Sequence, residues 1–174
     1  MSTYNAFLTA ALLAGFGLLT TGCATSKTAA PTTRVTQANK AEVLALITKV
    51  NDHWQAEHPA QVRAFWDVAA YQTGNMAAYA VTKNDQYRQY AEDWAVHNKW
   101  RGATSDDKGS WKYQYGETPD YVLFGDWQVC FQTYIDLYKL NPEPQRIARA
   151  REVMEYEMST PTNDYWWWAD AFTW

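Results

Sequence analysis

Three aspartates stand in the same short context at three places in this sequence. Each lies two positions after an aromatic residue, and the three are 59 and 44 residues apart: Asp67 after Phe65, Asp126 after Phe124, and Asp170 after Trp168. A carboxyl group can give a proton to a reacting atom or accept one from water, depending on its pKa. The repeated context therefore marks the three aspartates as candidates for acid and base chemistry.

An alternative is that these aspartates only start helices. Aspartate is a preferred N-cap, and each such cap stabilises a helix by about 1 kcal/mol. All three positions open segments that the hydrophobic pattern predicts as helical, so the residues alone leave both interpretations open.

The segments that would position the aspartates follow the helical period. Residues 65–81 and 126–140 are apolar on nearly every face, which predicts helices buried on all sides. Residues 38–58, 84–102 and the segment after Pro144 have one apolar face each. The faces expected to point inward in the first and last of these are Val43, Leu46, Ile47, Val50 and Trp54, and Ile147, Ala150, Met154 and Met158. Arg and Glu of the last segment are expected outward. This alternation predicts an all-α protein with two concentric layers of helices.

Local signals refine two of these segments. Asn84-Asp85 is an expected N-cap, and Gly102 is the expected end of the helix that follows it. Residues 101–120 are rich in Gly, Ser, Asp and Lys and show no sustained period. They predict a long loop, and long loops in compact domains are often functional.

Composition narrows the class of protein. The 174 residues are 47% hydrophobic, which is typical of a packed globular domain. A net charge of −4 gives no basic surface, so nucleic acid is not an expected partner. Ten Trp and twelve Tyr exceed what a core of this size needs. Their flat faces suit stacking on sugar rings as well as core packing.

The N-terminus reads as an export signal. An apolar run over residues 6–22 ends at Gly22-Cys23, which resembles the end of a bacterial lipobox whose cysteine is acylated. Thr20 and the lack of Lys or Arg before the run depart from that pattern, so cleavage elsewhere by an ordinary signal peptidase is the alternative. We expect an export signal over 1–23, a flexible linker over 24–37, and a periplasmic or cell-surface protein anchored to a membrane only through lipid on Cys23.

Neither cysteines nor histidines form a ligand set. Cys130 lies among apolar residues and is expected to be a small buried core residue. His53, His58 and His97 are scattered without a Cys or Asp at helical spacing. We therefore expect no metal and no cofactor.

These motifs together resemble the unsaturated rhamnogalacturonyl and glucuronyl hydrolases, glycoside hydrolase families 105 and 88, with family 105 the closer. The resemblance runs from about Ala41 to Trp174 and rests on Phe65-Trp66-Asp67 with Tyr71 and Gly74, on Asp126 with Gln132-Thr133-Tyr134, and on Trp167-Trp168-Ala169-Asp170. It implies an (α/α)6 toroid, a six-hairpin glycosidase, of which residues 38–174 would form about half.

The resemblance also implies a reaction. The substrate is an oligosaccharide, made by a polysaccharide lyase, that carries a Δ4,5-unsaturated uronic acid at its non-reducing end. Hydration of the double bond starts the cleavage, and two catalytic aspartates match Asp126 and Asp170. The tryptophans before Asp170 form an apolar surrounding that would raise its pKa and suit a proton donor. Asp126, at a helix N-terminus, would stay ionised and orient or activate water.

Further residues are implied as substrate contacts. They are Trp66, Asp67, Tyr71, Gln132, Trp167 and Trp168. Tyr71 lies one turn after Asp67 on the same helix face, where a core tyrosine is an equally ordinary interpretation. Trp166 to Trp168 cannot all face one way on a helix.

Two alternatives remain beside the hydrolase. One is a helical-hairpin repeat module that binds glycan or protein without chemistry, although its repeat length would vary. The other is an inactive fragment, because the third segment stops at Trp174, four residues after Asp170. We expect the chain by itself to be inactive.

Overall fold

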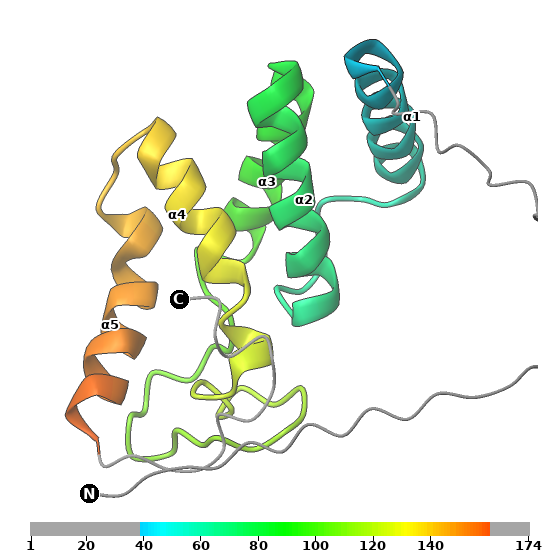
Figure 1. The fold of residues 1–174 in the computed structure, drawn as a ribbon. Helices are drawn as coiled ribbons and strands as arrows, with labels where there is room; N and C mark the ends of the chain where they lie inside the picture. The colour runs from blue at the N-terminus through cyan, green and yellow to red at the C-terminus, as the bar shows by residue number, and fades with distance from the viewer. Residues whose placement is uncertain (1–38, 161–174) are drawn as a thin grey trace, which may run out of the picture. The chain divides into compact units, whose positions relative to one another are not determined.

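The computed structural model describes residues 39–160, all of which lie in one compact unit, Gln37–Trp174. The described part is helical and contains no strand, which confirms the all-α prediction. In chain order its elements are α1 (Lys40–Glu57), α2 (Trp66–Thr82), α3 (Asp85–His97), the 3₁₀ turn η1 (Gly125–Trp127), α4 (Cys130–Leu140) and α5 (Gln145–Ser159) (Figure 1).

Two helices hold the others together. Helix α2 packs against α1, α3 and α4 and also touches η1, and α4 packs against α2, α3 and α5. The helices predicted to be buried on all sides are thus the two with the most neighbours. The helices predicted to be one-faced lie against these two: α1 on α2, α3 on both, and α5 on α4.

The core lies where α2, α3, α4 and α5 meet. Trp94 of α3 and Tyr134 of α4 are both fully buried, with ring centroids 5.5 Å apart. The Tyr134 hydroxyl donates to the carbonyl of Arg101 at 3.0 Å, and burial raises the pKa of this tyrosine. Cys130 is fully buried beside them, as predicted. Each large apolar side chain buried here stabilises the fold by about 1.5–3 kcal/mol.

Helix ends follow local capping. Asn39 and Glu42 form a capping box at the start of α1, and the predicted cap Asn84 accepts from the backbone N–H of Gln86 at 3.2 Å. Helix α3 ends at His97, earlier than predicted, because Lys99 and Trp100 take positive φ angles. Gly102 has a different role: a Cβ on it would lie 1.8 Å from the carbonyl oxygen of Trp127. It is a packing glycine and not a helix stop.

The predicted loop over 101–120 contains no helix or strand. It folds back on itself, since the backbone N–H of Lys112 donates to Asp120 at 2.9 Å and that of Ser105 to Pro119 at 3.0 Å. The buried indole of Trp111 donates to the carbonyl of Ser105 at 3.0 Å. The loop is therefore a packed part of the domain.

The predicted orientation of α5 is partly wrong. Arg146 and Arg149 were expected outward and are buried, whereas Met158 was expected inward and is 87% exposed. The Arg146 guanidinium pairs with Glu92 at 2.7 Å and lies 4.7 Å from the ring centroid of Trp100. An arginine can be buried when its charge is paired and its plane stacks on an aromatic face, which is the case here.

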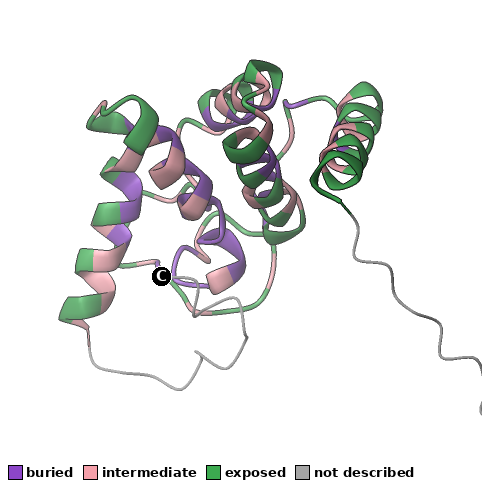
Figure 2. Ribbon diagram, turned by 45° about the horizontal axis from the view of Figure 1, so that its top comes forward, coloured by how far each residue is buried: buried purple, intermediate pink, exposed green. Residues whose placement is uncertain are grey.

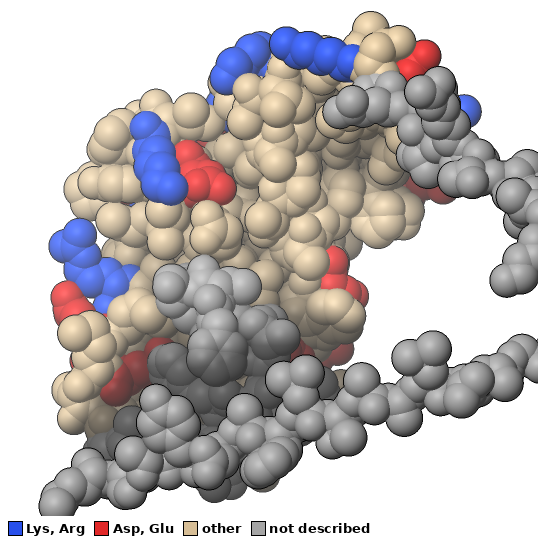
Figure 3. Space-filling model, viewed as in Figure 1, with Lys and Arg blue, Asp and Glu red and all other residues tan. Residues whose placement is uncertain are grey.

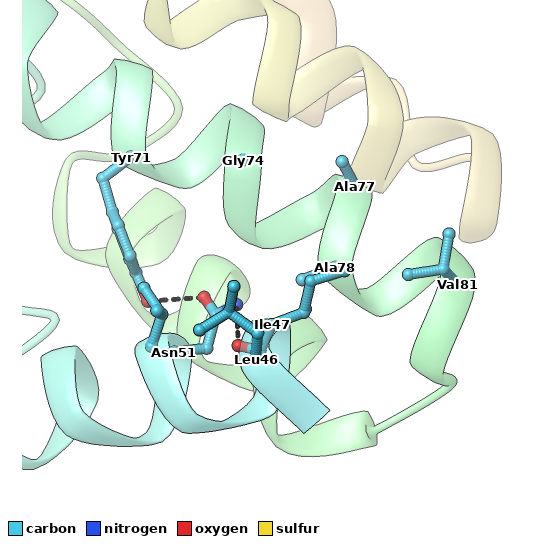
Figure 4. A pocket seen from close by; sticks show the side chains of 9 residues that line it. Leu46, Ile47, Asn51, Tyr71, Gly74, Ala77, Ala78 and Val81 are labelled. Carbon is cyan, nitrogen blue, oxygen red and sulfur yellow. Dashed lines mark hydrogen bonds between the residues drawn. The ribbon is translucent and has the colours of Figure 1, made fainter. Parts of the chain in front are cut away.

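The predicted burial of α1 and α2 is also partly wrong. Val43, Leu46 and Val50 of α1 are 43–62% exposed, and Asn51 is the buried residue of that helix (Figure 2). On α2, a face of small residues that includes Gly74 is exposed. The reason is that α1 packs on α2 through the face next to the predicted stripe. Between them lies an open apolar groove of about 480 Å³ (Figure 4).

Charged side chains are sparse on one face of the described residues. On the face seen in Figure 3, uncharged side chains cover most of the described surface, and basic and acidic ones lie in small separate groups. No described helix is long and apolar enough to cross a membrane.

Candidate active site

Asp126 lies in the 3₁₀ turn η1, one turn before α4 begins. It is 6% exposed, and the turn is closed by the N–H of Gln128, which donates to the Gly125 carbonyl at 2.7 Å. The predicted helix over 126–140 therefore starts later than expected, at Cys130. The carboxyl group of Asp126 is therefore buried just before a central helix. Aspartate is seldom buried to this degree, and an aspartate that only ends a loop would usually be exposed.

Asp67 lies in the first turn of α2 and is half-exposed. Its carboxylate accepts from Arg63 Nη2 at 3.2 Å. The same guanidinium pairs with Glu117 of the long loop at 2.5 Å, and this contact is the main cause that raises the pKa of Arg63. Arg63 thus ties the start of α2 to the loop.

Neither aspartate is the N-cap residue of its helix. The N-caps of α2, η1 and α4 are Phe65, Phe124 and Val129, and none of them makes a side-chain capping bond. Asp67 is the second residue of α2, and Asp126 is the second residue of η1, four positions before α4 begins. Both are acidic residues of a first helical turn, where the helix N-terminus favours negative charge.

An aromatic contact brings the two segments together. The rings of Phe65 and Trp127 meet edge to face with centroids 4.7 Å apart. The indole N–H of Trp127 also donates to the carbonyl of Gly116 at 3.0 Å. The neighbours of Asp67 and Asp126 are therefore packed against each other, with residues 116–117 of the loop beside both.

The structure places Tyr71 in the contact between α1 and α2. Its hydroxyl donates to Asn51 Oδ1 at 3.1 Å (Figure 4). The hydroxyl also accepts from Gln55 Nε2 at 3.3 Å, and the ring stacks on Trp54. Burial raises the pKa of Tyr71 to about 12. All these partners belong to α1, so the contacts of Tyr71 are those of a structural residue, and substrate binding by it stays a prediction.

The other predicted substrate residues fall into two groups. Trp66 is 48% exposed at the start of α2. Gln132 is half-buried on α4, where it donates weakly to Asp136 at 3.4 Å. Trp167, Trp168, Asp170 and Cys23 lie outside the described residues.

Gln128 and Glu157, which meet next to the turn of Asp126, were not among the predicted site residues. Gln128 is 3% exposed, and its side-chain amide donates to Glu157 Oε1 at 2.6 Å and to the Val122 carbonyl at 3.3 Å. Burial raises the pKa of Glu157 to about 7, and the hydrogen bond from Gln128 opposes this. The sequence offered one sign that Gln128 belongs to the site, namely its position two residues after Asp126. Nothing in the pattern of α5 indicated that Glu157 faces it.

Metal binding finds no support among the described residues. They contain no group of three or more His, Cys, Asp or Glu side chains that could hold an ion. The described site contains carboxyl groups and hydrogen-bonding amides.

Comparison with known proteins gives the wider context. The profile of Glycosyl Hydrolase Family 88 matches residues 35–173. A solved structure described as a glycosyl hydrolase family 88 protein from Bacteroides vulgatus is similar with a TM-score of 0.75 and 59% identity, over 77% of this chain. A second, named as a polysaccharide lyase, has a TM-score of 0.73 and 63% identity over 75% of the chain. No curated protein matches significantly.

The likeness covers only part of these relatives. The chain spans 38% of the length of the first structure and 37% of the second. The five described α-helices, the lack of a strand among the described residues and the likeness to the family 88 structure agree with the predicted all-α toroid fold.

Proposed function

The chain belongs to glycosyl hydrolase family 88, and from that premise we propose that it is the N-terminal portion of a hydrolase that removes a Δ4,5-unsaturated uronic acid from lyase-generated oligosaccharides. The observation that carries the proposal is Asp126. This carboxyl group is buried in a turn at the start of a central helix, beside the start of α2 and the long loop. A cap or a surface aspartate would need neither the burial nor the neighbours.

In the proposed reaction the two aspartates have different tasks. Asp170 protonates C4 of the unsaturated sugar, and Asp126 orients or activates the water that adds to C5. The resulting hemiketal opens and releases the neighbouring sugar. The placement of Asp126 before α4 supports its role, because the positive end of a helix favours an ionised carboxylate. The tryptophans next to Asp170 in the sequence support the role of Asp170, because an apolar surrounding favours the protonated form.

The proposed substrate is of the rhamnogalacturonan type. Its support is the resemblance of Phe65-Trp66-Asp67 and Trp167-Trp168-Ala169-Asp170 to the family 105 hydrolases. In this proposal the exposed ring of Trp66 stacks on a sugar face, and Asp67 and Gln132 bind hydroxyl groups.

A second candidate is a polysaccharide lyase, since one similar structure carries that name at 63% identity. The two activities change the double bond in opposite directions. A lyase removes a proton next to the uronate carboxyl group and expels the sugar oxygen, which creates the conjugated double bond. The proposed hydrolase consumes that bond.

Ultraviolet absorbance therefore tests both candidates in one assay. The protein to assay is this chain continued by the C-terminal part of the Bacteroides vulgatus relative, beside the chain alone. With an unsaturated rhamnogalacturonan disaccharide, the hydrolase lowers the absorbance of the conjugated uronate. With the intact polysaccharide, a lyase raises it. We expect the first result for the continued chain and no activity for the chain alone.

Substitutions then test the site. Asp126→Asn and Asp170→Asn should each lower turnover at least about 100-fold, the usual size of an acid or base contribution. The matched control is Asp93→Asn, an exposed aspartate on α3 that should leave turnover unchanged. Full turnover in the Asp126→Asn variant would overturn its role, and binding without turnover in the unsubstituted protein would favour the non-catalytic module.

A further inference from the structure

A buried contact joins the turn of Asp126 to the end of α5. Gln128 Nε2 lies 2.6 Å from Glu157 Oε1 and 3.3 Å from the Val122 carbonyl oxygen. Gln128 itself is 3% exposed, and its backbone N–H closes the turn that contains Asp126. The side chain two residues after Asp126 is therefore held by a helix that is 29 residues away in sequence.

The orientation of the Gln128 amide follows from its partners. A backbone carbonyl can only accept a hydrogen bond, so the amide atom that meets Val122 must be the NH₂ group. Its second hydrogen points to Glu157, whose Oε1 accepts in either protonation state. Both amide hydrogens are thus used, and the amide has one orientation.

Glu157 has an unusual environment for a glutamate. Its Oε2 atom is buried and has no hydrogen-bond partner within the described residues. Burial is the main cause that raises the pKa of Glu157 to about 7. An exposed glutamate on the surface of α5 would ionise without this loss of hydration, so the burial of Glu157 is not explained by helix solubility.

No described basic side chain pairs with Glu157. Glu152 of the same helix differs, because its carboxylate pairs with Arg149 at 2.8 Å and with Lys108 of the long loop at 3.3 Å. On the segment that holds Gln128, the nearest titratable groups in the chain are Asp126 and the buried thiol of Cys130.

We propose that Glu157 is a positioning residue, which fixes the amide of Gln128 and through it the turn that carries Asp126. The inference rests on the proposed function only in treating that turn as part of a substrate site. A Gln at position 157 can still accept from Gln128, whereas an Ala cannot. The contact should therefore survive Glu157→Gln and be lost in Glu157→Ala.

Nuclear magnetic resonance of the 174-residue chain tests this without any substrate. The side-chain amide of Gln128, assigned by its absence in Gln128→Met, is followed from pH 5 to pH 9. We expect it to shift with a midpoint near pH 7 in the unsubstituted chain, to stay constant with pH in Glu157→Gln, and to move away from its position in the unsubstituted chain in Glu157→Ala. The backbone amides of 126–128 should move in Glu157→Ala and be restored in Glu157→Gln.

The control is Glu155→Ala, an exposed glutamate on the same helix, which should leave the signals of 126–128 in place. A Gln128 side-chain amide that is the same in Glu157→Ala as in the unsubstituted chain overturns the proposal, and so do backbone amides of 126–128 that do not move in that variant. If Glu157→Ala fails to fold, the comparison between the unsubstituted chain and Glu157→Gln decides. An absence of turnover in the absorbance assay would count against the proposed hydrolase and would leave this result unaffected.

Discussion

The ring of Phe65 meets the ring of Trp127 edge to face, with centroids 4.7 Å apart. Phe65 precedes α2 and Trp127 ends η1, so this one pair joins the starts of the two central helices. Two candidate site residues, Asp67 and Asp126, lie within two positions of it. The pair is therefore both part of the core and the scaffold of the proposed site.

Removing the Phe65 ring should lower the stability of the protein strongly, whereas removing the exposed ring of its neighbour Trp66 should hardly change it. Phe65 is 4% exposed, so Phe65→Ala should lower the free energy of unfolding by about 3–5 kcal/mol. Trp66 is 48% exposed, and Trp66→Ala should change it by less than about 0.5 kcal/mol while weakening disaccharide binding. Urea unfolding and a binding titration measure the two effects. Equal losses of stability in both variants would contradict the assigned burial.

Two glycines should respond oppositely to alanine. A Cβ at Gly102 would lie 1.8 Å from the Trp127 carbonyl oxygen, and backbone cannot move aside easily. Gly102→Ala should therefore destabilise the protein by about 1–3 kcal/mol or more. At Gly74, within α2, no atom lies within 4 Å, and Gly74→Ala should stabilise the helix by up to about 1 kcal/mol. Thermal unfolding of both variants checks the pair, and a harmless Gly102→Ala would refute the close approach.

The protonation of Glu157 should make stability depend on pH. Its pKa is about 7 in the folded protein and 4.5 ordinarily, so the folded state binds more protons between these values. Its contribution to the free energy of unfolding is then constant below about pH 4.5 and becomes less favourable as pH rises to about 7. Glu157→Gln should remove this loss.

The matched measurement is the melting temperature at pH 5 and pH 8. We expect Glu157→Gln to melt higher than the unsubstituted chain at pH 8, with a smaller difference at pH 5. Glu155→Gln, which changes an exposed glutamate of the same helix, should follow the unsubstituted chain at both pH values. A constant difference between Glu157→Gln and the unsubstituted chain would mean that Glu157 does not titrate in this range.

Lipid attachment at Cys23 predicts membrane association of the exported protein. Each CH₂ group of an acyl chain that enters the membrane contributes about 0.8 kcal/mol to binding, and two or more chains anchor a protein stably. Cys23→Ala should therefore move the protein from the membrane to the soluble fraction. Cys130→Ala is the control, because this thiol is fully buried in the core. Membrane association of Cys23→Ala equal to that of the unsubstituted protein would favour the ordinary signal-peptidase alternative.

The sequence by itself determined the local structure of this protein. The apolar periods predicted every described α-helix, Asn84 was predicted as a cap, and residues 101–120 were predicted as a loop. These features depend on neighbours three or four residues away, so a single sequence contains the information for them. The three aspartates were found in the same way, from a repeated short context.

Only the tertiary structure decided which faces meet. Arg146 and Arg149 are buried because Trp100 and Trp111 lie over their guanidinium groups. Tyr71 donates a hydrogen bond to Asn51 of α1, and Gln128 donates one to Glu157 near the C-terminal end of α5. Each of these contacts joins residues that are far apart in the chain or on different helices. Helical periodicity states that a side chain lies on a certain face, but the partner on that face depends on how whole helices pack.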